Sequence, residues 1–242
     1  KLGQGDLTVA VPVESNDELG VLSEHFNQMT VGIKERYEMR RSLNLAREVQ
    51  QNLLPRDNPA VQGLDIAGKS IYCDETGGDY FDFLENEDPE GGKFVMIIGD
   101  VSEHGIPSAL LMATARAFIR QRSALSGDIS RVVSDVNRQL TRDVEETGRF
   151  MTLFYLLIDT TRRHLQWVRA GHDAAMLYDP ATDQFEELGG EGIALGINQA
   201  WQYQTYERGG LDSGQIILLC TDGLWEAQNS EGDMFGKDAI YE

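Results

Sequence analysis

Residues 94–102 read Phe-Val-Met-Ile-Ile-Gly-Asp-Val-Ser, an apolar run that stops at a glycine and an aspartate. The run predicts a buried strand. An aspartate that directly follows such a strand is poorly placed for packing, but it is well placed to hold a cation at the rim of a sheet. Residues 77–82, Gly-Gly-Asp-Tyr-Phe-Asp, and residues 220–223, Cys-Thr-Asp-Gly, also combine aspartate with glycine. Together the three segments predict one shared site built from Asp79, Asp100 and Asp222.

Carboxylates gathered from three distant segments indicate metal-assisted chemistry. Mg²⁺ and Mn²⁺ prefer oxygen ligands, and carboxylates clustered without a cation repel one another. Two ions about 3.5–4 Å apart clamp a phosphoryl group for in-line attack. Taken alone, each segment has a simpler explanation as a turn, since Asp222-Gly223 is a common turn pair; the three together favour the metal. Asp82 falls on the strand face opposite Asp79, and we expect it to be exposed.

The bulk composition limits the kinds of partner. The chain has 242 residues and a net charge of −19, from 21 basic and 40 acidic side chains. This balance argues against nucleic acid as a partner and against adhesion to anionic lipid. Cys73 and Cys220 both fall in strand-like segments, which favours two buried thiols in a reducing cytoplasm over a disulfide.

The hydrophobic pattern predicts an α+β fold. Strands are expected before and after a central pair of helices, an order typical of layered domains rather than of alternating βαβ units. The expected strands are residues 66–73, 80–84, 94–98, 151–158, 164–169, 175–178 and 216–220. The expected helices are residues 108–122 and 129–144.

The first part of the chain predicts a long helix. Asp17 and Glu18 precede an apolar series with helical spacing, as at a helix start. The apolar series is Leu22, Phe26, Met29 and Ile33, then Leu43, Ala46, Val49 and Leu53. Its heptad-like spacing weakens over residues 36–41. We expect a parallel dimer through at least the first part, the alternative being one amphipathic helix packed on its own domain.

The start of the chain resembles the second half of a HAMP domain, a dimeric helical linker placed directly after a transmembrane helix. The likeness lies in Asp-Glu-Leu-Gly at residues 17–20 and Phe-Asn-Gln-Met at residues 26–29. The first HAMP helix is missing. We therefore expect the chain to be the cytoplasmic portion of an inner-membrane receptor, attached to the membrane only through a missing N-terminal sensor region.

A longer series of motifs resembles the SpoIIE/RsbU family of bacterial PP2C-like serine/threonine phosphatases, over residues 45–242. The motifs are Leu-Ala-Arg-Glu-Val-Gln-Gln-Asn-Leu-Leu at residues 45–54, Gly-Gly-Asp-Tyr-Phe-Asp at 77–82, Gly-Asp-Val-Ser-x-x-Gly-Ile-Pro-Ser-Ala-Leu at 99–110, Phe-Met-Thr-Leu-Phe-Tyr at 150–155, Ala-Gly-His at 170–172, Leu-Gly at 195–196, Thr-Asp-Gly at 221–223 and Asn-x-x-Gly-x-x-Phe-Gly at 229–236. The resemblance implies a PP2C-like α/β/β/α sandwich and Mn²⁺- or Mg²⁺-dependent hydrolysis of phosphoserine or phosphothreonine on a protein.

The resemblance also implies roles for single residues. Carried over by motif, Asp100 bridges two metal ions, with the Val101 carbonyl as a further ligand. Asp79 binds one ion and Asp222 the other, and water activated by the ions is the nucleophile. His172 is expected to shape a turn rather than bind metal. His104 stands where the family usually has a lysine. It is close enough to contact the site or a phosphate, but we expect it to be a variable loop residue.

Further implications concern partners and boundaries. The usual substrate in the family is a phosphorylated STAS-domain protein, an anti-anti-sigma factor that acts in sigma factor regulation. We divide the chain into the C-terminal half of a HAMP domain at residues 1–32, a coiled-coil-like helical linker at 33–60 and a phosphatase domain at 61–242. The family normally continues into a strand with an Asp-Asp-x-Thr segment, so we expect this domain to lack its C-terminal strand and one metal ligand.

Two other functions remain alternatives. A catalytically inactive, phosphatase-like module would bind a signalling partner without turning it over. The clustered aspartates argue against this module, and the expected truncation argues for it. A HAMP segment also precedes histidine kinases and cyclases, but no nucleotide-binding glycine motif or phospho-acceptor helix follows it here.

Overall fold

The structure is a computed structural model that describes residues 6–71, 76–85, 92–125 and 127–241. The chain divides into two compact units, Lys1–Val49 and Gln50–Glu242. The helices are α1 (Glu18–Gln51), α2 (Ile106–Ser123) and α3 (Ile129–Val144), with 3-10 turns η2 (Asp222–Leu224) and η3 (Asp238–Ile240). The strands are β1 (Tyr80–Glu85), β2 (Lys93–Val101), β3 (Met151–Asp159), β4 (His164–Ala170), β5 (Ala175–Asp179), β6 (Gln184–Leu188), β7 (Tyr206–Gly209) and β8 (Ile216–Leu218).

In the first unit, α1 begins where the sequence predicts. The Asp17 carboxylate accepts hydrogen bonds from the Ser15 hydroxyl and, at 3.0 Å, from the Leu19 amide. These bonds hold the pKa of Asp17 below its usual value, and they cap the first turn of the helix. Asn27 then exchanges two hydrogen bonds of 2.8 Å with the main chain of Val11. The extended segment before α1 is thereby fixed to the helix that follows it.

The helix α1 is continuous over 34 residues, so the weaker heptad pattern at residues 36–41 does not interrupt it. Leu22, Met29 and Ile33 of the predicted dimer face are exposed in the single chain. The parallel dimer therefore stays a prediction. None of the helices among the residues that the structure describes is long and apolar enough to cross a membrane.

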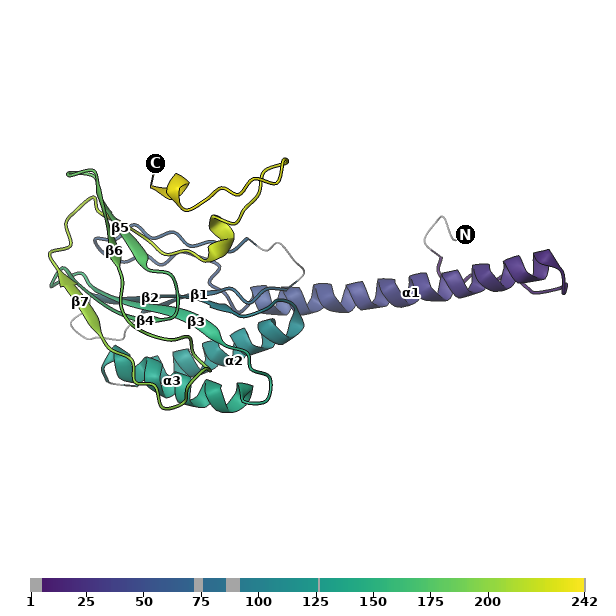
Figure 1. The fold of residues 1–242 in the computed structure, drawn as a ribbon, viewed down its shortest axis with the longest axis horizontal. Helices are drawn as coiled ribbons and strands as arrows, with labels where there is room; N and C mark the ends of the chain where they lie inside the picture. Colours follow the sequence, from purple (N-terminus) through teal and green to yellow (C-terminus); the bar gives the residue numbers. More distant parts are fainter. Residues whose placement is uncertain (1–5, 72–75, 86–91, 126, 242) are drawn as a thin grey trace. The chain divides into compact units, whose positions relative to one another are not determined.

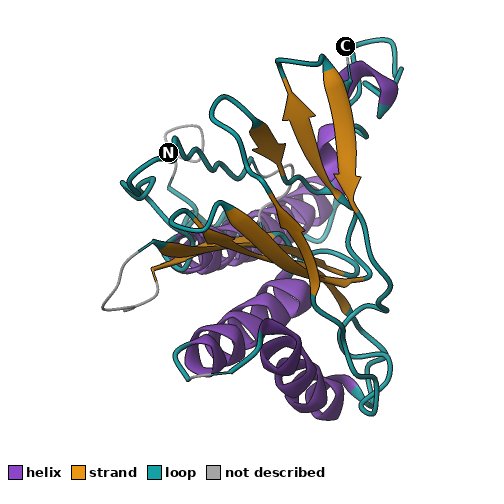
Figure 2. Cartoon of the chain, turned by 90° about the vertical axis from the view of Figure 1, so that its left-hand side faces the viewer, coloured by secondary structure: helices purple, strands orange, loops and turns teal. Residues whose placement is uncertain are grey.

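The second unit is a layered α+β domain. One antiparallel sheet has the strand order β1-β2-β3-β4-β7, and a smaller one has the order β6-β5-β8. The helices α2 and α3 cover one face of the five-stranded sheet, and the three-stranded sheet lies on its other face (Figures 1 and 2). Apart from the end of α1, the second unit contains no α-helix other than α2 and α3 within the described residues.

The strand β3 supplies both hydrophobic cores. Leu153 and Tyr155 belong to the cluster between the five-stranded sheet and the helices. Phe154, Leu156 and Ile158 belong to the cluster between the two sheets. Successive side chains of a strand point to opposite faces, so β3 is apolar throughout because it is buried on both sides.

The predicted strand at residues 66–73 is wrong over residues 66–71, which form no strand. The Gly68 amide donates to Asn58 Oδ1 at 3.1 Å instead of pairing with a strand. A Cβ added at Gly68 would lie 2.7 Å from the Phe83 ring, so the segment lies directly on the rings of β1. Cys73 lies outside the described residues, while Cys220 is a half-buried free thiol.

The predicted exposure of Asp82 is also wrong, because its side chain is 0 % exposed. Arg120 of α2 donates to both Asp82 carboxylate oxygens, from Nε and Nη2, each at 2.6 Å. Arg116 Nε lies 3.7 Å from the same carboxylate, and the Tyr80 hydroxyl donates to it at 3.0 Å. A buried carboxylate needs such partners, so this cluster joins β1 to α2.

Replacing Asp82 by Asn tests this cluster. The change leaves two arginines beside a neutral amide, and we expect the free energy of unfolding to fall by about 3 kcal/mol. Urea denaturation measures it. The matched control is Asp65→Asn at an exposed carboxylate, which should change stability by less than about 0.5 kcal/mol. Equal effects of the two substitutions would contradict a stabilising role for the buried pair.

Candidate functional site

The sheet register brings Asp79 and Asp100 together. Tyr80 pairs with Gly99 across β1 and β2, so Asp79 and Asp100 come next in line at the same end of the sheet. Both carboxyl groups are half-buried. Desolvation is the largest cause of the raised pKa of both groups, the Asp79 charge raises the pKa of Asp100 further, and a hydrogen bond between the two carboxyls affects both pKa values. Two of the three predicted residues are therefore direct neighbours.

Asp222 approaches from the smaller sheet. It begins the 3-10 turn η2, after the end of β8, and its side chain is exposed. Its charge acts on both Asp79 and Asp100. The adjacent Thr221 hydroxyl donates to Asp79 Oδ2 at 3.3 Å. The fold thus gathers all three predicted aspartates from segments that lie far apart in the sequence.

Burial and mutual repulsion govern the ionisation of the cluster. Desolvation, followed by the charges of Asp79 and Asp222, raises the pKa of Asp100 to about 7. Desolvation also raises the pKa of Asp79, with the Asp222 charge adding to it. Carboxyls this close favour a shared proton when no cation is present, and a divalent cation would replace that proton.

The oxygen atoms at the site are ligands of the kind that a hard divalent cation prefers. Asp79, Asp100 and Asp222 offer carboxylate oxygens, and the carbonyl of buried Val101 lies beside them. A Cβ added at Gly78 would lie 2.5 Å from that carbonyl and 3.0 Å from Asp100 Oδ1. Glycine therefore keeps this approach open. Among the described residues, no group of three or more acidic, histidine or cysteine side chains already has the arrangement of a metal site. The carboxyls interact directly with one another instead.

One supporting residue comes from the end of α1. Gln50 is buried, its Nε2 donates to the Gly77 carbonyl at 2.5 Å, and its Oε1 accepts from the Gly77 amide at 3.4 Å. Gly77 lies two residues before Asp79, so this amide pair fixes the segment that carries Asp79. Gln50 belongs to the motif at residues 45–54, but nothing in the sequence distinguishes it from the other polar residues of that motif.

The two histidines near the cluster differ. His104 is exposed in the loop after Asp100, in line with the expectation of a loop residue. His172 is buried, and burial lowers its pKa. Its Nδ1 lies 2.8 Å from the Thr152 hydroxyl, and its carbonyl accepts a hydrogen bond from Arg169. His172 lies in a bend between β4 and β5, and its ring contacts Thr152, the residue of β3 that pairs with Asp100.

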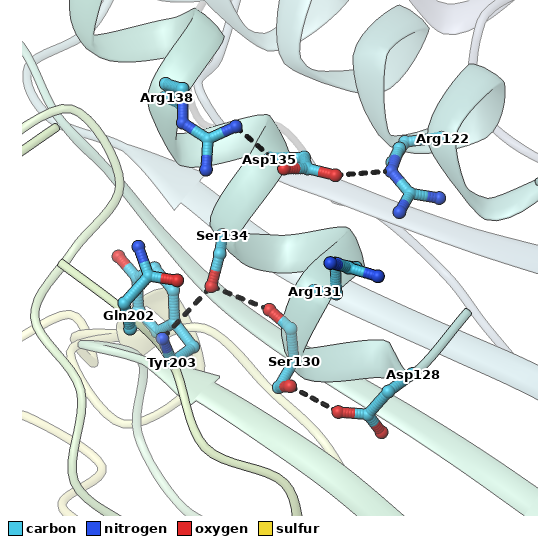
Figure 3. Close-up of a pocket in the computed structure, with 9 residues that line it drawn as sticks. All are labelled: Arg122, Asp128, Ser130, Arg131, Ser134, Asp135, Arg138, Gln202 and Tyr203. Carbon is cyan, nitrogen blue, oxygen red and sulfur yellow. Dashed lines mark hydrogen bonds and ion pairs between the residues drawn. The ribbon is translucent and has the colours of Figure 1, made fainter. Parts of the chain in front are cut away.

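A hollow of about 710 Å³ lies elsewhere, beside α3. Figure 3 shows that its charged side chains largely face one another. Asp135 accepts from Arg122 at 2.7 Å and from Arg138 at 2.9 Å. None of the three aspartates lines it, so it is not the candidate site.

Comparisons with known proteins agree with the motifs. Residues 90–242 match the family model described as Stage II sporulation protein E (SpoIIE), and residues 1–35 match the HAMP domain model. The chain is 28% identical over 206 residues to the phosphoserine phosphatase RsbU of Bacillus subtilis, covering 85% of this chain and 59% of that protein. It is 28% identical to the phosphoserine phosphatase RsbP of the same organism, covering 77% of this chain and 46% of that protein. The chain thus spans about half the length of the curated relatives it matches.

Solved structures support the fold. The SiaA-PP2C domain of Pseudomonas aeruginosa aligns with a TM-score of 0.66 at 23% identity, covering 86% of this chain and 81% of that one. The PP2C domain of SpoIIE from Bacillus subtilis aligns with a TM-score of 0.54 at 16% identity, covering 69% and 45%. These likenesses concern the fold alone. They confirm the predicted PP2C-like class.

The pKa of Asp100 predicts how the metal-free protein responds to pH. Because its pKa is about 7 in the folded state and the ordinary value of an aspartate is 3.8, the folded state binds more protons than the unfolded state between these values. Its contribution to stability is therefore fully present below about pH 4 and is lost as pH rises through about 7. Unfolding in a chelator, compared between wild type and Asp100→Asn, measures this. An identical pH dependence in the two proteins would contradict the raised pKa of Asp100, which burial and then the neighbouring charges cause.

Proposed function

Because the chain belongs to the SpoIIE family, we propose that it acts as a metal-dependent protein phosphatase that hydrolyses phosphoserine or phosphothreonine. The observation that carries the proposal is the convergence of Asp79, Asp100 and Asp222 at one end of the sheet sandwich. The phosphoserine phosphatase names of RsbU and RsbP support the same reaction. Family membership alone would not assign an activity; the gathered carboxylates give it a chemical basis.

The residues at the site would bind the metal, and the metal would act on the phosphoryl group and on water. Bound Mn²⁺ or Mg²⁺ supplies Lewis acidity toward a phosphoryl group and lowers the pKa of water. Asp79, Asp100 and Asp222 would hold the metal through their carboxylate oxygens, with the Thr221 hydroxyl orienting Asp79. The Val101 carbonyl adds a neutral oxygen.

The substrate we propose is a phosphorylated STAS-domain protein in a pathway that regulates a sigma factor. The names of the relatives RsbU and RsbP support phosphoserine as the group that is hydrolysed. The net charge of −19 disfavours nucleic acid as a competing substrate. This part of the proposal is independent of the metal chemistry, since a different phosphoprotein would be hydrolysed by the same residues.

We also propose that the HAMP segment controls the phosphatase activity. Residues 1–35 match a HAMP domain, and α1 runs from that segment into the phosphatase unit. Gln50, near the end of α1, is bonded to Gly77 two residues from Asp79. A signal from a sensor in the membrane would thus be transmitted to the site through a dimer of α1 helices, on the cytoplasmic side.

Phosphate release from a phosphoserine-bearing STAS protein in Mn²⁺ tests the function. The assay uses this chain and the longest natural form of the protein, each as wild type and as Asp100→Asn. We expect the wild type to release phosphate and the Asn variant to lose at least about 100-fold in rate, since a metal ligand is lost. The control is Asp65→Asn at an exposed site, which should keep full activity.

Two results would contradict the proposal. Turnover that persists in Asp100→Asn would place the chemistry elsewhere. Tight binding of the phosphoprotein without phosphate release in any divalent metal, by the longest form as well, would instead support a catalytically inactive module that binds a signalling partner.

A further inference from the structure

Two segments continue the larger sheet beyond Asp100. Ser102 directly follows β2, and Phe150 directly precedes β3. The Ser102 amide donates to the Phe150 carbonyl at 2.9 Å, and the Phe150 amide donates to the Ser102 hydroxyl at 3.1 Å. One position further on, Arg149 Nη2 donates to the Glu103 carboxylate at 2.8 Å. The loop that leads into α2 is therefore fixed to the segment before β3, next to the aspartate cluster.

A third segment, residues 195–198, joins these two. Its main chain exchanges two hydrogen bonds with the first residue of β3. The fully buried Asn137 of α3 accepts a hydrogen bond from the Gly196 amide at 3.0 Å and donates to the Asn198 carbonyl at 2.8 Å. Ile197 lies between these two residues, so one buried amide side chain holds its backbone from both sides.

Each of the three segments exposes a large apolar side chain. Ile197 is 57 % exposed, Ile106 is 43 % exposed and Phe150 is 38 % exposed. Leu110, one helical turn after Ile106, is 64 % exposed. The hydrogen bonds around them and the first turns of α2 fix their backbones. Single exposed apolar residues are common on protein surfaces, but a group of them around one site indicates an interaction surface. We call these four residues the apolar rim.

The apolar rim is uncharged overall, although the chain is strongly acidic. In residues 102–110, 149–151 and 195–206 the only aspartate, glutamate, lysine or arginine side chains are Glu103 and Arg149, which pair with each other. The whole chain has a net charge of −19, which opposes the approach of an acidic partner. A phosphoserine adds about −1.5 to −2 charges to its protein. A phosphorylated partner therefore meets less repulsion at these segments than over acidic surface.

We propose that the apolar rim is the docking surface for the substrate, a phosphoprotein with exposed apolar side chains beside its phosphoserine. The inference rests on the proposed function, because it names what the same site requires of its substrate. A phosphoseryl group that reaches Asp100 brings its neighbouring residues over the three segments that meet there. Burial of apolar surface on both sides then favours a protein over a small phosphate ester.

Substitutions in the rim test the docking surface. Ile197→Ser and Phe150→Ser remove apolar area, whereas Ile197→Leu keeps it. The matched control is Leu125→Ser, because Leu125 is 53 % exposed but follows the other end of α2. Each protein is assayed in Mn²⁺ on the phosphoserine-bearing STAS protein and on p-nitrophenyl phosphate, which has no side chains to place on the rim. Binding of the same phosphoprotein is measured by calorimetry with each substitution added to Asp100→Asn, where turnover does not consume it.

We expect the two serine substitutions to lower the ratio of kcat/KM for the phosphoprotein to kcat/KM for p-nitrophenyl phosphate by about 10-fold, mainly through KM. Binding in the Asp100→Asn background should weaken by a similar factor. Ile197→Leu and Leu125→Ser should keep both quantities within about twofold. Structural damage at the site would instead slow both substrates alike and leave the ratio unchanged.

The outcomes distinguish this inference from the proposed function. A wild type that hydrolyses both substrates, with the same ratio and the same affinity in the serine variants, would overturn the docking surface alone. So would an unchanged ratio together with a shifted monomer–dimer equilibrium in sedimentation, which would assign the rim to a second copy of this chain. A wild type that releases phosphate from neither substrate would overturn the proposed function. Phosphoprotein binding that Ile197→Ser weakens would still support the surface in that case, and its absence would overturn the surface as well.

Discussion

The second unit holds three carboxyl groups that repel one another close together. Asp79 and Asp100 lie side by side because β1 and β2 pair in register up to Tyr80 and Gly99, and Asp222 joins them from beyond β8. Such a cluster costs free energy unless a proton or a cation neutralises it. The apolar faces of β3 stabilise both sheets around this point, and the same packing that stabilises the domain keeps the carboxyls together.

Much of this arrangement was predictable from the sequence. Apolar runs locate β2, β3 and β4, and helical spacing locates α2 and α3, because each buries one or two faces. The short motifs locate the aspartates. The strands β6 and β7 escape prediction: the β6 side chains before Leu188 are exposed, and β7 has only four residues, so neither shows a strong pattern.

The wrong predictions for Asp82 and for residues 66–71 have a common physical cause. Asp82 alternates with apolar neighbours as an exposed residue would, yet Arg120, 38 residues away, buries it. The segment around Gly68 has the pattern of a strand, but the Gly68 amide donates to Asn58 and the glycine lies against the rings of Phe81 and Phe83. Gln50 and His172 are likewise defined by partners distant in sequence. Periodicity reports which face is apolar, and it carries no information about which distant polar group meets another.

The central claim is that the three aspartates form a binding site for divalent metal ions, and anomalous diffraction tests it most directly. Crystals of the protein grown with Mn²⁺ would be measured on both sides of the manganese absorption edge. Our account predicts anomalous peaks among Asp79, Asp100, Asp222 and the Val101 carbonyl, at metal–oxygen distances of about 2.0–2.3 Å. Well-ordered carboxyls with no anomalous peak between them, at a saturating Mn²⁺ concentration, would contradict it.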